Sequence, residues 1–374
     1  MAKRSRKKRR RNPAANLTDD LIVEILSRLP VKSLCRFKCV SRHWRRLIHH
    51  SRLPQTSAGL FYRTIDHTRF PQEARHFVNV WGSLMPPLVR PSLSFVPGNK
   101  RISRVLDSCN GLLLCLRTEN SSSSGVPFSY IVCNPATKSW VVLPDPGRVN
   151  KLCAARLGFD PAVSLHFHVF AFAGNDEGYV EALQIYSCET GAWSYKEIEW
   201  DYDIFLTHES RSIFFNGSLH LVNYMCEIVA VDVEGEIWRA LLVPDVGDMT
   251  VWEEGFLGRY QGQLCYINEC DYESDLSLWV LEDYSTDEWI LKHHVSIEKL
   301  CEKKLKPYGS RFYHMITVLP DCNLILYSAG LENTLMAYDI DLEEVYAIKK
   351  LGKKCSLPYI PYVPFYSESL THGH

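Results

Sequence analysis

The sequence predicts a mostly β protein with a small all-α module near its N-terminal end, and three observations support this prediction. Helical periodicity is confined to residues 16–53. After residue 58, short β-rich runs alternate with clusters of Gly, Pro, Asn, Asp and Ser. A tryptophan then recurs at spacings of 53, 45 and 51 residues, which is typical of four-stranded blades in a β-propeller. We therefore expect a helical module followed by a propeller of about six blades.

The helical module begins with residues suited to a helix N-terminus. Thr18 offers a capping oxygen, and Asp19 and Asp20 place carboxylates near the positive end of the helix dipole. Pro30 is expected to end this helix, because the residue before a proline avoids the helical region. Between these limits the apolar residues follow one face of a helix: Leu21, Ile22, Ile25, Leu26 and Leu29.

Two further short helices are expected before residue 54. One carries Leu34 and Phe37, and the next is capped by Ser41, with an inner face formed by Trp44, Leu47 and Ile48. Three helices in about forty residues bury little core. Their apolar side chains exceed what such a module can hide, so part of this surface should face a partner.

Residues 17–48 resemble an F-box, the segment that docks on the Skp-family adaptor of cullin-type ubiquitin ligases. One departure is that Thr18 stands where the family usually has a proline, although a threonine cap can start the same helix. The alternative is an ordinary helical hairpin that packs on the next domain. The matching positions are Asp20, Leu21, Glu24, Ile25, Leu26, Leu29, Pro30, Lys32, Ser33, Leu34, Phe37, Lys38, Cys39, Val40, Ser41, Trp44, Leu47 and Ile48.

The resemblance implies a non-catalytic subunit of a Skp-cullin-F-box (SCF) ubiquitin ligase that recruits a protein target and needs no cofactor. Two alternatives stay open. One is an F-box scaffold or transcriptional partner that works without the ligase, and the other is a propeller lectin or enzyme with an incidental helical arm. The implied adaptor-binding residues are Leu17, Leu21, Ile25, Leu29, Pro30, Leu34, Phe37, Val40 and Trp44.

Residues 1–15 are expected to form a basic disordered tail before the helical module of residues 16–57. Without eight basic residues of this tail the formal charge falls from −1 to −9, and such like charges repel one another. The tail is interpreted as a nuclear-import tag, or as a solvated segment that contacts nucleic acid non-specifically. The residues are Lys3, Arg4, Arg6, Lys7, Lys8, Arg9, Arg10 and Arg11.

Localisation is expected to be nuclear, cytoplasmic or both. The basic tail lacks the apolar stretch of a secretory signal, and the sequence has no run of 18 apolar residues. The thirteen cysteines are scattered without a Cys-x-x-Cys pair, which favours free thiols in a reducing compartment. Redox control through Cys265 and Cys270 is the alternative.

Residues 58–374 carry the repeat that predicts the propeller. In one half of each repeat a polar turn leads into a strand opened by Trp140, Trp193, Trp238 or Trp289, and a last copy has Val345 before Tyr346. The other half is a hairpin such as CNGLLLCL, FNGSLHLV or QGQLCYI. Because a single blade cannot cover both its faces, stacking around an axis buries them in turn. A β-sandwich or two stacked sheets is the alternative.

The repeat divides this region into units. Five are clear: Gly111–Pro144, Arg156–Glu199, Ser212–Pro244, Phe256–Val295 and Phe312–Leu351. A weaker sixth, Ala58–Arg104, would be completed by the apolar tail that carries Pro358, Pro361 and Pro364, closing the ring. Strands expected from composition include Gly59–Tyr62, Phe77–Trp81, Leu93–Val96, Gly111–Leu116, Tyr130–Cys133 and Val169–Phe172.

Residues 105–370 resemble the kelch-like domain associated with plant F-box proteins. The segments DSCNGLLLCL, NPATKSWVVLP, LGFDP, IYSCETGAWSY and FFNGSLHLV follow one another in the order of that domain. The double glycine of a full kelch repeat is missing, so six blades are expected and seven are allowed. In that family the domain captures the protein to be ubiquitylated.

Catalytic signatures are missing from the sequence. There is no Gly-x-Ser-x-Gly elbow, no Gly-x-Gly-x-x-Gly loop, no phosphate-binding Lys loop and no His-Glu-x-x-His. His166 and His168 alternate in an apolar strand without a third metal ligand, and His293 and His294 cannot share a strand face. We therefore expect no metal, and we expect the repeated tryptophans to pack between blades rather than stack on sugars.

Target binding is expected from loops at one end of the ring, because the strands are occupied by packing. Three segments combine carboxylates with aromatic residues: Glu199–Glu209, Asp245–Glu254 and Asn268–Asp275. Aromatic rings supply contact area and acids select charge, so a basic or amphipathic target surface is expected, unless these are only solvated loops. The candidate residues are Trp200, Tyr202, Phe205, Trp252, Glu253, Glu254, Asp271 and Tyr272.

Overall fold

The computed structural model describes residues 18–27, 43–44, 47, 58–68, 73–80, 89–98, 102–118, 128–147, 152–175, 179–198, 204–206, 210–223, 227–236, 238–244, 255–268, 275–301, 313–319 and 323–366. The chain divides into two compact units, Met1–Ser57 and Ala58–His374. Each unit is treated separately below.

In the first unit, α1 (Asp19–Ser27) begins where the acidic residues predict. The Ile22 amide donates the first helical hydrogen bond to the Thr18 carbonyl at 3.0 Å. A second link joins α1 to the helical residues 43–44, because His43 Nε2 lies 2.8 Å from Asp19 Oδ1. The predicted helix end at Pro30 and the helix around Leu34 lie outside the described residues.

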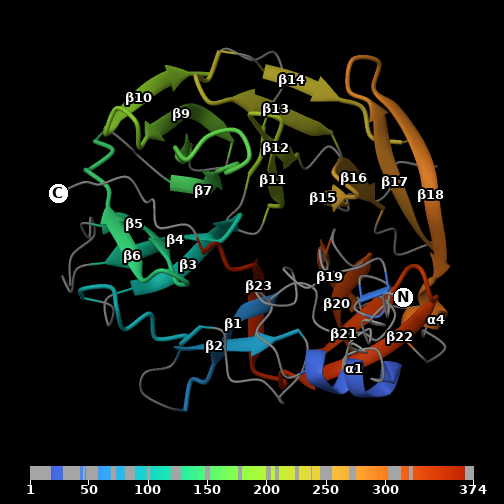
Figure 1. Cartoon of the computed structure of the whole chain (residues 1–374). Helices are drawn as coiled ribbons and strands as arrows, with labels where there is room; N and C mark the ends of the chain where they lie inside the picture. The colour runs from blue at the N-terminus through green and yellow to red at the C-terminus, as the bar shows by residue number, and fades with distance from the viewer. Residues whose placement is uncertain are drawn as a thin grey trace, which may run out of the picture. The chain divides into compact units, whose positions relative to one another are not determined.

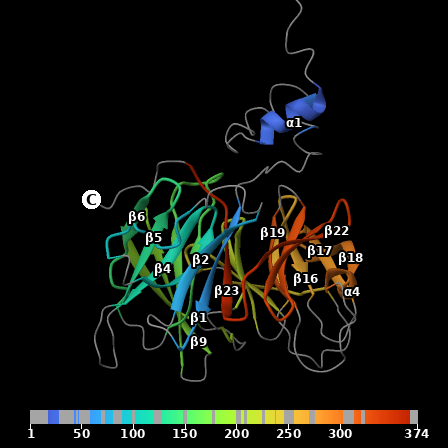
Figure 2. The ribbon, with the colours of Figure 1, turned by 90° about the horizontal axis from the view of Figure 1, so that it is seen from below.

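The second unit is a ring of six β-sheets around a central axis, as far as the chain is described (Figure 1). This confirms the mostly β, six-bladed propeller expected from the repeat. Blade 1 has three strands and blades 2 to 6 have four each. Seen from the side, the strands of each blade run between the two ends of the ring (Figure 2).

The strands of blades 1 to 3 have the following bounds. Blade 1 contains β1 (Gly59–Ile65), β2 (Glu73–Asn79) and β23 (Cys355–Tyr362). Blade 2 contains β3 (Ile102–Cys109), β4 (Leu112–Thr118), β5 (Phe128–Asn134) and β6 (Ser139–Val142). Blade 3 contains β7 (Leu152–Gly158), β8 (His168–Gly174), β9 (Val180–Ser187) and β10 (Ala192–Glu197).

Blades 4 to 6 repeat this pattern. Blade 4 contains β11 (Ser212–Phe215), β12 (Ser218–Val222), β13 (Ile228–Asp232) and β14 (Trp238–Leu241). Blade 5 contains β15 (Phe256–Tyr260), β16 (Gln263–Ile267), β17 (Asp275–Asp283) and β18 (Glu288–Ser296), followed by the short helix α4 (Ile297–Cys301). Blade 6 contains β19 (Tyr313–Leu319), β20 (Leu324–Ala329), β21 (Thr334–Asp339) and β22 (Glu344–Lys350).

The inner strands and the core explain why the ring closes. The inner strands β3, β7, β11, β15, β19 and β23 contact one another in this order, and β23 returns to β3. Within the described ranges, the buried hydrophobic side chains form six clusters, one between each pair of neighbouring blades. Each blade therefore buries both its faces, which is the physical basis expected for stacked repeats.

Ring closure uses the apolar tail, as the sequence predicts. The closing strand β23 pairs with β1 in antiparallel register, with Gly59 opposite Tyr362 and Phe61 opposite Ile360. The first two strands and the last strand of the second unit thus form blade 1. The predicted unit Ala58–Arg104 is wrong at its end, because β3 begins at Ile102 and belongs to blade 2.

The predicted strand Leu93–Val96 is also wrong. These residues form turns, and Leu93 has φ 48°, which a strand does not allow. Leu93 and Val96 are instead fully buried in the cluster between blades 1 and 2. Their apolar character therefore reflects burial without strand pairing, and composition alone does not distinguish the two.

Antiparallel order gives the ring two distinct ends. Connections from the first to the second strand of a blade, such as Asn110–Gly111, define the hairpin end. Connections from the second to the third strand, and from one blade to the next, define the loop end. Ala58 precedes the second strand of blade 1, so the chain enters the ring at the hairpin end.

The chain continues past the closing strand as a short strap, residues Val363–Tyr366, at the hairpin end. The Asn134 side-chain amide donates a hydrogen bond to the Phe365 carbonyl at 2.8 Å. The Phe365 ring lies edge-on to Phe159 of blade 3, with 5.4 Å between centroids. The strap therefore ties blade 1 to blades 2 and 3.

Candidate functional site

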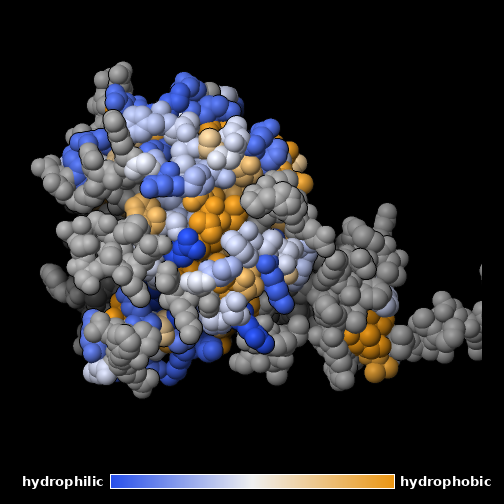
Figure 3. Space-filling view, turned by 90° about the vertical axis from the view of Figure 1, so that its left-hand side faces the viewer, coloured by the Kyte–Doolittle hydropathy of each residue, from blue (hydrophilic) through white to orange (hydrophobic). Residues whose placement is uncertain are grey.

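An apolar face of α1 is open at the surface of the first unit. Leu21 is 51% exposed and Ile25 is 48% exposed, whereas Ile22 and Leu26 are buried. Because Leu21 and Ile25 are four residues apart, they lie on one face of the helix. Apolar side chains of this unit are visible at its surface (Figure 3).

The other predicted adaptor-binding residues are only partly covered by the structure. Trp44 is half-buried. Those outside the described residues are Leu17, Leu29, Pro30, Leu34, Phe37 and Val40. The eight basic residues of the tail, Lys3 to Arg11, also lie outside them. No helix in the described part of the chain is long and apolar enough to cross a membrane.

The strands that flank the three predicted target segments end at the same end of the ring. Glu199–Glu209 connects β10 to β11, and Asp245–Glu254 connects β14 to β15. Asn268–Asp275 connects the second strand β16 to the third strand β17. By the alternation of antiparallel strands, all three connections belong to the loop end.

Among the predicted target residues, Phe205 lies within the described chain. Its backbone pairs with Tyr179 in an isolated bridge, and the two rings are edge-on with centroids 5.8 Å apart. The Phe205 amide donates to Asn223 Oδ1 at 3.1 Å. The neighbours Ile204 and Leu206 are buried at 2% exposure. Phe205 is therefore held firmly at the loop end, between blades 3 and 4.

Tyr179 is a residue that the sequence did not single out. Its place beside Phe205 depends on a pairing between two connections, and no local repeat position marks it. The remaining predicted target residues lie outside the described ranges: Trp200, Tyr202, Trp252, Glu253, Glu254, Asp271 and Tyr272.

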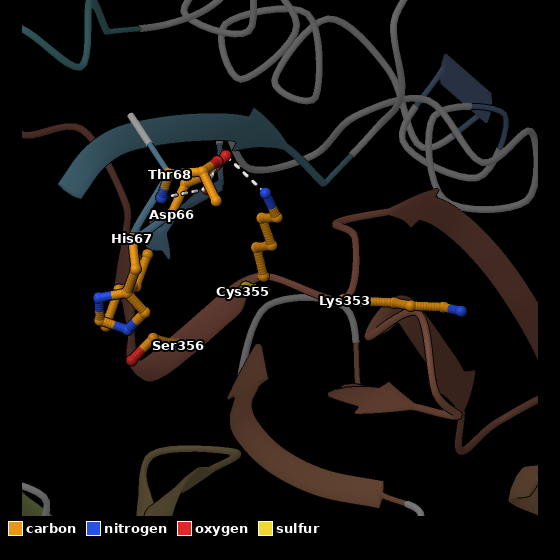
Figure 4. A pocket seen from close by; sticks show the side chains of 8 residues that line it. Asp66, His67, Thr68, Lys353, Cys355 and Ser356 are labelled. Carbon is orange, nitrogen blue, oxygen red and sulfur yellow. Dashed lines mark hydrogen bonds and ion pairs between the residues drawn. The ribbon is translucent and has the colours of Figure 1, made fainter. Parts of the chain in front are cut away.

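A pocket of about 480 Å³ lies where the ring closes, at the loop end (Figure 4). Asp66 Oδ2 lies 2.5 Å from Lys354 Nζ, and Thr68 donates to Asp66 Oδ1 from its backbone amide and from its hydroxyl. These bonds, led by that of Lys354, hold the pKa of Asp66 well below its usual range. The ion pair therefore joins the end of β1 to the start of β23.

The pocket is lined by charged, polar and apolar side chains. Lys354 is paired with Asp66. Lys353 points away from Asp66, and His67 lies near Ser356 (Figure 4). Nothing in the sequence pattern predicted this pocket, because its two sides are almost 290 residues apart in the chain. In the described residues, no group of three His, Cys, Asp or Glu side chains is placed to hold a metal ion.

Two of the repeated tryptophans join neighbouring blades, as predicted. Trp193 Nε1 of blade 3 donates to the Pro144 carbonyl at 2.9 Å, and Trp289 Nε1 of blade 5 donates to the Leu242 carbonyl at 2.8 Å. Each acceptor lies one or two residues after the end of the outer strand of the preceding blade.

The prediction of packing between blades is wrong for Trp140, which is 40% exposed. The preceding blade 1 has no described outer strand for its indole to reach. The side chain of Trp238 lies outside what the structure describes.

The strand histidines have ordinary partners. His293 Nε2 lies 2.8 Å from the Tyr338 hydroxyl of blade 6, and His294 Nδ1 lies 2.9 Å from Ser277 Oγ of its own blade. Burial lowers the pKa of His168 at the start of β8. His166 precedes β8 and lies 3.7 Å from Glu189, so the expected continuous strand through both histidines is wrong.

Comparison with known families matches both parts of the chain. Residues 76–350 match the F-box associated beta propeller domain, and residues 15–56 match the F-box domain. These matches confirm both resemblances seen in the sequence.

Individual relatives come from Arabidopsis thaliana. F-box protein At5g07610 is 27% identical over 311 residues, which cover 75% of this chain and 71% of the relative. F-box protein At5g49610 is 29% identical over 321 residues, which cover 77% of this chain and 81% of the relative. F-box protein At1g30790 is 27% identical over 298 residues, covering 72% and 73% respectively.

Proposed function

The chain belongs to the family of F-box proteins that carry an F-box associated β-propeller, and we propose that it recruits a protein target to an SCF-type ubiquitin ligase. The observation that supports this proposal most directly is the exposed pair Leu21 and Ile25 on the helix of the F-box. Apolar side chains on one open helix face are suited to a helix-in-groove or helix-packing contact with an adaptor.

The division of labour follows from the two units. The F-box holds a Skp-type adaptor, and through it a cullin, while the propeller holds the target. Other subunits then carry out ubiquitin transfer, and this chain contributes effective concentration and orientation. It needs no catalytic residue of its own for that role.

Target capture is assigned to the loop end of the ring. The strands that flank the three acidic and aromatic segments end there, and Phe205 contacts Tyr179 at the same end. Aromatic anchors surrounded by acids fit a basic or amphipathic protein surface.

The adaptor contact is tested with Leu21→Asp and Ile25→Asp together. Each places a charge on the open helix face, so adaptor affinity should fall by a few kcal/mol, as hot-spot loss does. Leu29→Ala with Pro30→Ala is expected to act in the same direction. The matched control is Val163→Asp with Leu331→Asp, which changes two ring residues that are 80% and 78% exposed. Unchanged co-purification of the adaptor with the helix variant would refute the proposal.

An F-box protein that acts as a scaffold without the ligase is the second candidate. A scaffold would make the same adaptor contact, so adaptor binding does not distinguish a scaffold from a ligase subunit. The presence of a cullin in complexes purified through the adaptor supports the ligase role. Its consistent absence supports the scaffold.

A further inference from the structure

Three arginines lie on or next to the inner strands of three consecutive blades. Arg156 lies on the inner strand β7, Arg211 directly precedes β11, and Arg259 lies on β15. The Arg211 guanidinium lies 5.1 Å from the centre of the Phe256 ring on β15. The Arg259 guanidinium lies 5.3 Å from the Phe215 ring on β11. Two of the cations therefore pack against the same pair of inner strands.

Arg156 is fully compensated within the protein. It is only 4% exposed and donates hydrogen bonds to the carbonyls of Ala155 and Ser210. Its counter-charge is Asp107 on the adjacent inner strand β3, whose carboxylate also accepts the amide of Leu157 at 2.8 Å. Arg156 and Asp107 thus form a neutral pair between blades 2 and 3.

Arg259 has no such compensation. Its Nε atom is buried without a hydrogen-bond partner, and its side chain makes no hydrogen bond or ion pair with any described residue. A buried N–H group without an acceptor is costly, because it has lost its water and gained no replacement, although the Arg259 side chain as a whole is only partly buried. The contact with Phe215 covers one face of the group but accepts none of its N–H donors.

The Cys109 thiol does not neutralise this charge. Cys109 lies on β3 of blade 2, the blade opposite β15 in the ring. Burial raises the pKa of the Cys109 thiol, Asp107 raises it further, and Arg259 lowers it, so the two side chains are near each other. The thiol stays protonated and neutral near pH 7, so it is not a counter-ion for Arg259.

Arg239 shows how the charge of a stacked arginine is compensated elsewhere in this protein. Arg239 also stacks on an aromatic ring, with 4.8 Å to the centre of Tyr284. It donates to Asp287 Oδ1 at 2.5 Å and to the Ser285 carbonyl at 3.5 Å. Arg239 is therefore a matched reference for Arg259, with the same stacking but with a carboxylate partner.

We propose that the axis of the ring binds a small anion through Arg259. The chemical class is a carboxylate or a phosphoryl group, whose paired oxygens match the two-pronged N–H donors of a guanidinium. This site is separate from the adaptor face and does not depend on the ubiquitin ligase role.

Arg259 is one residue before Tyr260, the last residue of β15, so it lies toward the hairpin end of the axis, whereas Arg211 precedes β11 and lies at the loop end. The anion is either an acidic or phosphorylated side chain of a bound protein, or a free phosphate compound. Both sources present the same oxygens.

The test uses the full chain and inorganic phosphate at constant ionic strength, with chloride as the reference. Phosphate is expected to raise the thermal midpoint of the wild type by a few degrees, because it binds the folded chain alone. Arg259→Gln should abolish this shift, and Arg239→Gln should retain it. A wild type that responds equally to phosphate and chloride overturns the proposal. So does an equal phosphate shift in Arg259→Gln, or loss of the shift in both variants.

A direct titration does not depend on how the variants fold. Calorimetric titration of the wild-type chain with inorganic phosphate should show one site per chain, and absence of a saturable site overturns the proposal. Arg259→Lys keeps the charge but not the two-pronged geometry, and should weaken phosphate binding at least several-fold. Tighter binding of an aspartate-rich or phosphoserine peptide than of phosphate would identify a protein side chain as the source, and the reverse would identify a free compound.

Discussion

Asp107 is a single carboxyl group that links two neighbouring blades. Its two oxygens accept the amides of Ser108 and Leu157, at 2.8 Å each, and Arg156 lies near it. Burial raises the pKa of Asp107 to about 6, while Arg156 and the amide donors oppose that rise. The carboxyl therefore binds its proton more tightly in the folded chain than in the unfolded one.

This raised pKa predicts the sign of a pH effect. As the pH rises from about 4 to about 6, the unfolded chain loses the Asp107 proton before the folded chain does, so ionisation disfavours folding. The stability of the wild type relative to Asp107→Asn should therefore fall over this range, by on the order of 2 kcal/mol, and then level off. Urea denaturation of both proteins at several pH values measures the difference. A difference that rises with pH would contradict the raised pKa.

The repeated tryptophans allow a second prediction at the residue scale. Trp289→Phe removes the hydrogen bond to the Leu242 carbonyl and part of a buried contact, so it should cost about 1–2 kcal/mol of stability. Trp140→Phe changes an exposed side chain and should stay within about 0.5 kcal/mol. Equal losses in urea denaturation would show that Trp289 has no special role between blades.

Sequence patterns predicted the tryptophan contacts between blades but not the polar contacts of Asp107 and Arg259. The role of Trp193 and Trp289 followed from their recurrence in the sequence. The pairing of Asp107 with the Leu157 amide joins residues 50 positions apart. The stacking of Arg259 on Phe215 likewise depends on which strands are innermost. No repeat position marks these polar side chains, so they could not be read before the blades were assembled.

At the scale of elements, the strap Val363–Tyr366 makes one hairpin turn different from its equivalents. Gly111 and Gly217 both follow an asparagine in first hairpin turns, with φ of 88° and 78°. A Cβ at Gly111 would lie 2.3 Å from Phe365 Cβ, whereas a Cβ at Gly217 would meet nothing within 4 Å. Both positions therefore favour glycine because of the positive φ. Gly111 is restricted further because the strap leaves no room for a Cβ atom.

The corresponding prediction compares Gly111→Ala with Gly217→Ala. The positive φ alone should cost each variant about 1–2 kcal/mol. Gly111→Ala should lose more, because the new methyl group displaces Phe365. Deleting residues 363–374 should bring the two losses to the same value in a double-mutant comparison of unfolding free energies. If the excess loss survived that deletion, the strap would not be its cause.

Most blades could be predicted as elements, because their turns and alternating runs are local signals. Asn–Gly turns and the polar turns before Trp193 and Trp289 placed the hairpins correctly. Blade 1 was harder, since its strands come from the two ends of the ring-forming chain. The error at Leu93–Val96 arose because turn residues buried between blades are as apolar as a strand.

At the scale of the whole molecule, the ring separates two kinds of surface. The chain enters the ring at the hairpin end, where Ala58 precedes β1, and the three proposed target segments join strands at the loop end. The sequence predicted the order of the two units and six blades. Which loops share an end follows from strand topology, and the closure pocket at Asp66 and Lys354 follows from ring closure.

The proposed recruiting role predicts that the two binding activities can be lost one at a time. Leu21→Asp with Ile25→Asp alters the F-box, and Trp200→Ala with Trp252→Ala and Tyr272→Ala alters the loop-end segments. The first set should release the adaptor, and the second should release only the target. Thermal unfolding should confirm that the β ring remains folded in both variants.

Mass spectrometry of proteins that co-purify with the adaptor through this chain, with the proteasome blocked, tests the central claim most directly. The account predicts a set of captured proteins that is present with the wild type and lost with either variant, while the adaptor itself is lost only with the helix variant. Retention of the adaptor by Leu21→Asp with Ile25→Asp, or an unchanged captured set with the loop-end variant, would contradict it.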